Sequence, residues 1–432
     1  MNSNLARFIF EQGARLRNPS LFEQYEFLKT TEFASQKELE NLQLENAQKF
    51  LRLAETHSPY YKNLFAKIGF KSNNLGSLED LQAIPEINKE TLISENAAIH
   101  SQGLSEQCRL AETSGTSGAA LSFNRNERWD SLNRATMMRS YDWYGVKPWD
   151  RNGYLWGYNI SPREALKIRT LDSLQNRFRL FNYSHSEIKT FSQRLQSAQF
   201  LSGYSSMIYQ VAKAINEYQL PSPQLRLIKG TSEMVLDIYR KESELAFGRT
   251  ITGEYGAAEA GLIAFECPYG NMHINTENLI LERNHKGEAI VTNFASISFP
   301  IIRYNLGDTV EFSNSTCSCG RKHPILKEVS GRKGTSVLGE TNSYPGLTFY
   351  YVFKNLAIQK DILINYKAVQ VEKGKVSIYI ENLENKKYEE VIADELTKYF
   401  NEDVKFQIYY EQRFEISKRK QQYFESTLDQ KM

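Results

Sequence analysis

The stretch Leu225-Arg226-Leu227-Ile228 is a short apolar strand pattern that ends at Gly230, and it begins the part of the sequence that decides the fold. A helical pattern follows from Asp237 to Phe247, and Thr250-Ile251-Thr252 then predicts another strand. The same alternation of strands and helices covers residues 110–310 approximately. This pattern predicts an α/β domain with largely parallel sheets.

The sequence on either side of this stretch predicts two domains. A long helix is expected after Ser35, because apolar side chains recur there about every 3.6 residues. After about residue 330 the pattern changes to a helix, two strands joined by a turn, and a further helix and strand. We therefore expect an α/β protein with a large N-terminal domain of mixed sheets and flanking helices (1–330). A small, mobile α+β C-terminal domain (331–432) would be joined to it by a hinge at 331–334.

Composition excludes several classes of protein. The 432 residues include 53 Lys and Arg against 51 Asp and Glu, a formal charge of +2, so sequence-independent nucleic-acid binding is not expected. No apolar run reaches the ~20 residues that cross a bilayer, so no membrane span is expected. The first residues lack the pattern of a secretory signal, which predicts a cytoplasmic protein. A homodimer is one of the assemblies that the sequence allows.

The loop Thr113-Ser114-Gly115-Thr116-Ser117-Gly118 is the most informative stretch for function. Two glycines among four hydroxyl residues offer many N–H and O–H donors with little steric hindrance. Such a loop can wrap around phosphate oxygens. A plain Ser/Gly loop is the alternative interpretation of this stretch.

Two later stretches support the phosphate interpretation. Gly253 to Glu259 is expected to follow a strand, where Tyr255 could stack on a base and Glu259 could hold Mg²⁺ against the phosphates. In Arg303-Tyr304-Asn305-Leu306-Gly307-Asp308 an acid follows a tight turn, where ribose hydroxyls could donate to it.

With Gly331-Arg332 after them, these motifs together resemble the adenylate-forming ligase superfamily. Within it the sequence is most similar to the phenylacetate–CoA ligase branch and its capsule-biosynthesis (CapK-like) members. The resemblance covers residues 35–426 approximately, and it depends on four motifs in the same order.

The resemblance implies a set of ATP-binding residues. Ser114 to Gly118 would close over the β- and γ-phosphates, Tyr255 would stack on the adenine, Glu259 would coordinate Mg²⁺ and Asp308 would bind the ribose. The full implied ATP-binding set is Thr113, Ser114, Gly115, Thr116, Ser117, Gly118, Gly230, Ser232, Glu233, Tyr255, Gly256, Asp308 and Arg332.

The resemblance also implies catalytic residues and a reaction. The implied catalytic residues are Thr116, Glu259 and a C-terminal lysine, for which Lys420 is preferred over Lys418. A small carboxylic acid would be adenylated by ATP, giving acyl-AMP and pyrophosphate, and the acyl group would pass to coenzyme A. The alternatives are transfer to an amine, such as a sugar-linked one in surface polysaccharide biosynthesis, and a non-catalytic nucleotide-binding homologue.

Three cysteines and a histidine form a second candidate site. Cys267 and His273 lie six residues apart, and Cys317 and Cys319 are separated by one residue. Three thiolates and an imidazole suit a closed tetrahedral Zn²⁺ site, although unpaired buried cysteines are the alternative. His323 is an alternative to His273 as the fourth ligand.

Overall fold

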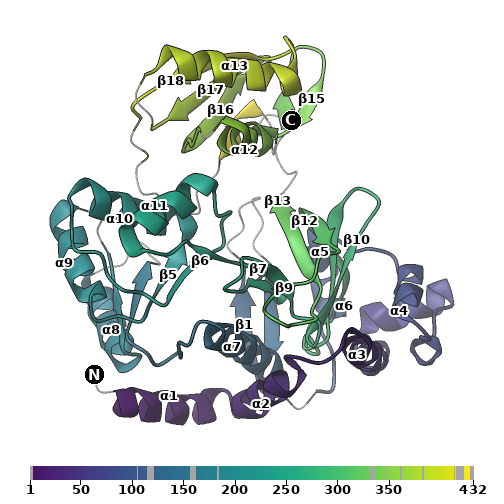
Figure 1. Ribbon diagram of the computed structural model, residues 1–432. Coiled ribbons are helices and arrows are strands. Elements are labelled where there is room, and N and C mark those ends of the chain that lie inside the picture. Colours follow the sequence, from purple (N-terminus) through teal and green to yellow (C-terminus); the bar gives the residue numbers. More distant parts are fainter. Residues whose placement is uncertain are drawn as a thin grey trace. The chain divides into compact units, whose positions relative to one another are not determined.

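The computed structural model (Figure 1) describes residues 3–104, 106–113, 121–155, 162–181, 184–330, 336–346, 348–360, 362–381, 384–412, 414 and 423–428. The chain divides into two compact units. The first unit comprises residues 1–150, 174–176 and 252–329, and the second comprises residues 151–173, 177–251 and 330–432.

The first unit combines N-terminal helices with a sheet of hairpin-connected strands. Its helices are α1 (Ser3–Arg17), α2 (Leu21–Thr31), α3 (Gln36–His57), α4 (Pro59–Ile68), η1 (Ser72–Asn74), η2 (Leu78–Ala83), α5 (Lys89–Ser94), α6 (Asn96–Ile99) and α7 (Glu127–Asp142). Its strands are β1 (Cys108–Glu112), β2 (Ser122–Asn126), β7 (Thr252–Ala257), β8 (Gly261–Glu266), β9 (Met272–Ile274), β10 (Leu279–Arg283), β11 (Glu288–Asn293), β12 (Ile301–Ser313) and β13 (Ile325–Ser330).

The strands of the first unit lie in the order β10-β11-β12-β13-β9-β8-β7. Along the chain, no helix lies between β7 and β13. Pairing is antiparallel between β7 and β8, β8 and β9, β9 and β13, β10 and β11, and β11 and β12. The expectation of largely parallel sheets is therefore wrong for this unit. Short hairpin turns join most of these strands, and only long crossovers permit parallel pairing.

The second unit contains the parallel sheet that the alternating pattern predicted. Its elements up to residue 251 are β3 (Asn152–Leu155), α8 (Pro162–Leu174), β4 (Arg177–Arg179), α9 (His185–Leu195), β5 (Phe200–Tyr204), α10 (Ser205–Glu217), β6 (Leu227–Thr231) and α11 (Asp237–Phe247). The strands β6, β5, β3 and β4 lie in this order and pair in parallel. Helices α9, α10 and α11 lie beside these strands in Figure 1.

The C-terminal part of the second unit has a core of its own. Its elements are β14 (Ser336–Leu338), β15 (Ser343–Pro345), α12 (Thr348–Lys360), β16 (Tyr366–Glu372), β17 (Lys375–Ile380), α13 (Lys386–Phe400), β18 (Lys405–Tyr409) and β19 (Phe424–Ser426). A four-stranded sheet in the order β18-β17-β16-β19 contributes to a buried cluster that includes Phe349, Ile378 and Leu396. The predicted hairpin appears as the antiparallel pair β16–β17.

Local sequence signals account for several helix ends. The side chain of Ser35 accepts a hydrogen bond from the backbone N–H of Glu38, and the Glu38 carboxylate accepts one from the backbone N–H of Ser35, which is a capping box at the start of α3. Gly248 ends α11 in the left-handed conformation, with φ of 68°. Leucine and aromatic side chains of α3, including Phe50 and Leu51, are buried against the sheet of the first unit, as their spacing predicted.

One boundary near the expected nucleotide site differs from the prediction. The strand expected at 250–252 begins at Thr252 and continues to Ala257, so Tyr255 lies within β7 rather than after it. Glycines favoured a loop at this place, but Gly256 is required by close packing. A Cβ atom on Gly256 would lie 2.5 Å from the Gly261 carbonyl oxygen in the neighbouring strand β8.

Candidate active site and Cys/His cluster

A pair of tyrosine–carboxylate contacts forms the centre of the candidate nucleotide site in the first unit. The Tyr304 hydroxyl donates to Glu259 Oε1 at 2.9 Å, and the Tyr255 hydroxyl donates to Asp308 Oδ2 at 3.0 Å. Tyr255 comes from β7, Tyr304 and Asp308 come from β12, and Glu259 lies in the turn between β7 and β8. The fold thus brings together three residues that the sequence assigned to the nucleotide.

Glu259 is held in a way that suits a metal ligand. Glu259 is 3% exposed. Within the described ranges its one hydrogen-bond partner is Tyr304, which is 1% exposed. One carboxylate oxygen is therefore fixed by the core, and the other is left to accept a cation. A rigidly held carboxylate oxygen is the type of ligand that Mg²⁺ prefers.

Arg125 lies against the same turn and was not anticipated from the sequence. Its guanidinium donates to the Ala258 carbonyl oxygen at 2.6 Å and packs on the rings of Phe123 and Trp129. Burial lowers the pKa of Arg125, whereas the charges of Asp130 and Glu259 act to raise it. No local sequence motif marks this arginine, because its contact with the turn is made to a carbonyl oxygen 133 residues away.

Arg303, the first residue of the second motif, has a structural role. Its guanidinium donates to the Ile84 carbonyl oxygen at 2.5 Å and to Glu282 at 3.1 Å. Ile87 also forms a parallel bridge opposite Tyr304: the Ile87 N–H donates to the Arg303 carbonyl oxygen at 3.1 Å, and the Asn305 N–H donates to the Ile87 carbonyl oxygen at 2.8 Å. These contacts attach the segment before α5 to β12 and so fix the strand that carries Tyr304 and Asp308.

The predicted phosphate loop is anchored by its first residue. Thr113 and Leu121 exchange hydrogen bonds: the Thr113 N–H donates to the Leu121 carbonyl at 2.9 Å, and the Leu121 N–H donates to Thr113 Oγ1 at 3.0 Å. These bonds extend the β1–β2 pairing one position beyond Glu112 and Ser122, at the loop end of the hairpin. The remaining loop residues, Ser114, Gly115, Thr116, Ser117 and Gly118, lie outside the described residues, as do Arg332, Lys418 and Lys420.

The remaining candidates belong to the second unit. Gly230 lies in β6, where an added Cβ would meet Ser205 Oγ at 2.6 Å and Ile251 Cγ2 at 2.7 Å. Ser232 follows in a left-handed backbone conformation, with φ of 65°. The Glu233 carboxylate accepts a hydrogen bond from the backbone N–H of Ser206 at 2.9 Å, so this side chain caps the start of α10.

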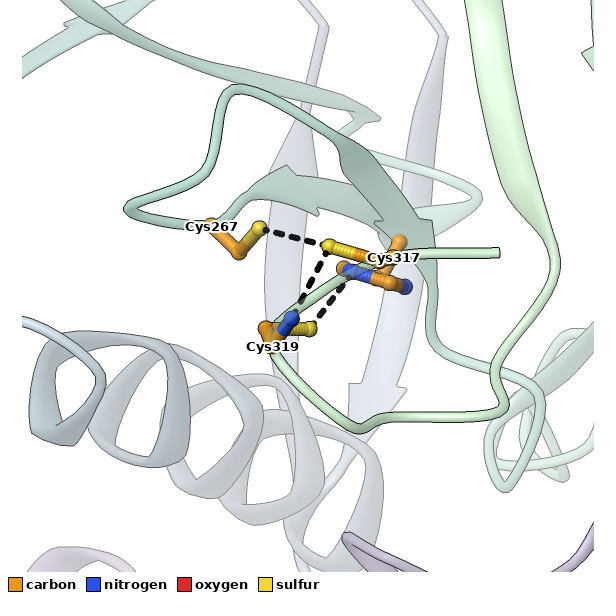
Figure 2. A group of neighbouring side chains, drawn as sticks. Cys267, Cys317 and Cys319 are labelled. Carbon is orange, nitrogen blue, oxygen red and sulfur yellow. Dashed lines mark hydrogen bonds between the residues drawn. The ribbon is translucent and has the colours of Figure 1, made fainter. Parts of the chain in front are cut away.

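The cysteines and histidine expected to bind zinc converge in the first unit. Figure 2 shows Cys267, Cys317 and Cys319 facing one another from two loops. The Sγ atoms of Cys267 and Cys317 are 3.6 Å apart, and Cys319 Sγ is 3.2 Å from His273 Nε2. All four candidate ligand atoms lie within 4.8 Å of one another.

The pKa shifts in this cluster differ between its imidazole and its thiols. Burial lowers the pKa of His273 to about 4, so the imidazole is neutral at physiological pH. Burial raises the pKa of Cys267 to about 12. Burial also acts to raise the pKa of Cys319, but hydrogen bonds from Arg321 and Cys317 outweigh it and lower that pKa.

His323, the alternative fourth ligand, is engaged elsewhere. Its Nε2 is 2.9 Å from Glu277 Oε1, and its carbonyl oxygen is 3.2 Å from His273 Nδ1. A proton on His273 Nδ1 would be donated to this carbonyl, leaving the Nε2 lone pair facing the sulfurs. The structure therefore favours His273 as the ligand and gives the His323 backbone the role of orienting it.

A buried ion pair supports this corner of the first unit. Arg139 and Glu277 are 1% and 0% exposed at their side chains, with Arg139 Nη1 2.5 Å from Glu277 Oε1. Thr31 of α2 also donates to Glu277 at 2.8 Å. Burial acts to raise the pKa of Glu277, but the charges of Arg139 and His323 outweigh it and hold the pKa well below its usual range.

Comparisons with known proteins bear on the fold and on the sequence likeness of the chain. No known family model matches the sequence. The chain is 22% identical over 310 residues to Protein CapK of Staphylococcus aureus, covering 68% of each sequence. A crystal structure of 2-hydroxyisobutyryl-CoA ligase with R3-HIB-AMP matches 92% of each chain at 16% identity, with a TM-score of 0.72. The same ligase with 2-HIB-AMP matches with a TM-score of 0.71 at 15% identity.

The chain has the adenylate-forming ligase fold. The predicted α/β architecture with a separate C-terminal part is confirmed. The sequence likeness to CapK and the structural likeness to the ligase agree with the resemblance to adenylate-forming ligases that the motifs indicated. In the described part of the adenylate-forming fold, no helix combines the length and apolar character needed to span a bilayer.

Proposed function

We propose that this protein is an AMP-forming acid ligase that activates a small carboxylic acid with ATP and transfers the acyl group to coenzyme A. The observation that carries the proposal is the paired arrangement of Tyr304 with Glu259 and of Tyr255 with Asp308 on adjoining elements. The fold supports it, because one similar solved structure is 2-hydroxyisobutyryl-CoA ligase in the postadenylation state in complex with R3-HIB-AMP.

The chemistry explains why this arrangement is needed. A carboxylate is a poor acyl donor because its leaving group would be oxide, and attack on the α-phosphate of ATP replaces oxide with AMP. Both reactants are anions, so the site must neutralise and align charge. Glu259 would hold Mg²⁺, which supplies positive charge to the phosphates.

The other residues would position the nucleotide. Asp308 would accept hydrogen bonds from the ribose hydroxyls while the Tyr255 hydroxyl holds one of its oxygens. The loop from Ser114 to Gly118 would surround the phosphates, and Lys420 would approach the forming acyl phosphate. Because ATP and coenzyme A are cytoplasmic reactants, the proposed reaction places the protein in the cytoplasm.

The Cys/His cluster would have a structural role in this enzyme. We propose that Cys267, His273, Cys317 and Cys319 bind one Zn²⁺ ion. In a tetrahedral site with Zn–S bonds of about 2.3 Å, sulfur atoms are about 3.8 Å apart. The Cys267–Cys317 separation of 3.6 Å lies close to that value. The ion would tie the two loops that carry its ligands.

Acid-dependent exchange of labelled pyrophosphate into ATP tests the proposed activity. With aryl, short-chain and hydroxy acids as the panel, at least one acid should support exchange by the unmodified protein. Glu259→Gln should lower that exchange by about 100-fold, the size of loss seen when one preorganised charge contact is removed. Glu311→Gln, an exposed carboxylate further along β12, should leave it unchanged.

Two outcomes would each favour an alternative function over the proposed one. Absence of exchange with every acid, in protein shown to be folded, favours a non-catalytic nucleotide-binding homologue. Exchange without thioester formation, and with product formed on addition of amines, favours the amide-forming alternative.

A further inference from the structure

Two arginines pack against one buried ring in the second unit. Phe178 lies in β4, at the edge of the parallel sheet, and is 2% exposed. The Cζ atoms of Arg151 and Arg194 lie 5.1 Å and 4.5 Å from the centroid of its ring. Arg151 immediately precedes β3 and Arg194 belongs to α9, so two separate elements direct guanidinium groups to one fixed aromatic surface.

Ser197 joins these two arginines through hydrogen bonds. Arg151 Nε donates to Ser197 Oγ at 2.8 Å. The same hydroxyl donates to the carbonyl oxygen of Arg194 at 3.1 Å. The two guanidinium groups are thus held on a common frame by packing and hydrogen bonding.

Among the described residues, the arginines that pack on Phe178 form no ion pair. Arg169 of α8 packs on the neighbouring ring of Phe181, with its Cζ atom 5.5 Å from the ring centroid. Arg151, Arg169 and Arg194 have no acidic partner within the described part of the second unit. Burial lowers the pKa of Arg194, and the charges of Arg151 and Arg169 lower it further. By contrast, Arg179, which follows Phe178 in β4, forms an ion pair with Asp172 at 3.0 Å.

Within the second unit, the arginines also lie away from Ser232, one of the residues expected to bind ATP. Arg151 and Ser197 precede the parallel strands β3 and β5, so they lie at the N-terminal edge of this sheet. Ser232 follows β6 and lies at the opposite, C-terminal edge, where ligands of open parallel sheets usually bind. A ligand held by the arginines would therefore occupy a site separate from the one around Ser232.

We propose that Arg151, Arg169 and Arg194 form a binding site for a phosphate group. Guanidinium forks match the geometry of phosphate oxygens, and a dianion would offset the repulsion between clustered cations. The group could belong to a free phosphate ion or to a phosphate ester such as that of a nucleotide. The site is independent of the proposed ligase activity.

Isothermal titration calorimetry of the full chain in low-chloride buffer tests this site. The probes are inorganic phosphate, as the free ion, and adenosine 3′,5′-bisphosphate, as the ester. The Arg151→Gln/Arg194→Gln variant should bind the preferred probe at least about tenfold more weakly than the unmodified protein. The control Lys189→Gln/Arg249→Gln removes two exposed positive charges of the same unit and should change affinity less than about twofold.

Each outcome decides the proposal. Equal affinity in the arginine variant, equal losses in both variants, or no binding of either probe by the unmodified protein would overturn it. The single variant Arg194→Gln, which changes an exposed side chain, should also weaken binding and should fold normally by circular dichroism. Tighter binding of the ester identifies a nucleotide-type ligand, and tighter binding of phosphate identifies the free ion; either supports the site.

Discussion

The Tyr304 hydroxyl holds the Glu259 carboxylate by a hydrogen bond. Removing this hydroxyl should therefore weaken Mg²⁺ binding by Glu259. Tyr304→Phe keeps the buried ring but leaves the buried carboxylate one donor short, which should cost about 1–3 kcal/mol of stability. A less constrained carboxylate should also bind Mg²⁺ more weakly. We expect the Mg²⁺ concentration for half-maximal pyrophosphate exchange to rise severalfold, as measured by Mg²⁺ titration.

Tyr144→Phe is a suitable control for this change. The Tyr144 hydroxyl donates to the Glu266 carbonyl oxygen at 2.9 Å, also in the first unit, and has no contact with Glu259. An unchanged Mg²⁺ requirement in Tyr304→Phe would show that the hydroxyl does not position the carboxylate.

Arg139 illustrates how strongly a single buried charge depends on its partner. Arg139→Met would leave Glu277 charged and almost fully buried, so we expect a loss of about 3–5 kcal/mol in the free energy of unfolding. Arg128→Met on the same helix α7 breaks an exposed pair with Glu23 and should cost about 0–1 kcal/mol. Urea denaturation of both variants measures the difference, and equal losses would contradict this account of Glu277.

At the scale of elements, the loop after β8 and the loop before β13 are joined by the Cys/His cluster. We predict that purified protein contains about one equivalent of zinc and that Cys317→Ser loses it. Chelation of the ion should lower the melting temperature, because metal binding stabilises only the folded state. Elemental analysis and thermal unfolding measure the two effects.

Cys108→Ser provides the matched control for the zinc prediction. Cys108 is exposed in β1 and lies outside the cluster, so its substitution should leave both metal content and melting temperature unchanged. Folded protein without metal would contradict the zinc assignment.

Two glycines in different elements should respond to alanine in opposite ways. Gly230→Ala would place a Cβ 2.6 Å from Ser205 Oγ and 2.7 Å from Ile251 Cγ2, so we expect a loss of about 1–3 kcal/mol in stability. Gly13 lies within α1 with no atom near an added Cβ, so Gly13→Ala should gain about 0.5–1 kcal/mol. Urea unfolding compares the two, and a neutral Gly230→Ala would show that β6 can shift at this point.

At the scale of the whole molecule, local sequence patterns predicted individual helices and strands better than they predicted the contacts between those elements. The capping box at Ser35 and the glycine at position 248 marked the ends of α3 and α11, because capping depends on residues close in sequence. The antiparallel pairing in the sheet of the first unit was not predicted, since strand direction depends on connections that short apolar patterns do not reveal.

The candidate site was predicted in part for the same reason. Motif order identified Tyr255, Glu259 and Asp308, and the fold brings these residues together. The donor to Glu259 lies 45 residues away, and the partner of Arg139 lies 138 residues away, so no spacing rule could have found either pair. Arg125 was missed because its link to the site is a contact with a backbone carbonyl 133 residues away.

The central claim is that separate loops contribute to one site for ATP and Mg²⁺. A crystal structure of the protein with ATP and Mg²⁺ tests it most directly. We predict that one nucleotide contacts Thr116 at its phosphates, Glu259 through the metal and Asp308 at its ribose. A nucleotide bound away from Glu259 and Asp308, or these three residues lying in separate places, would contradict the account.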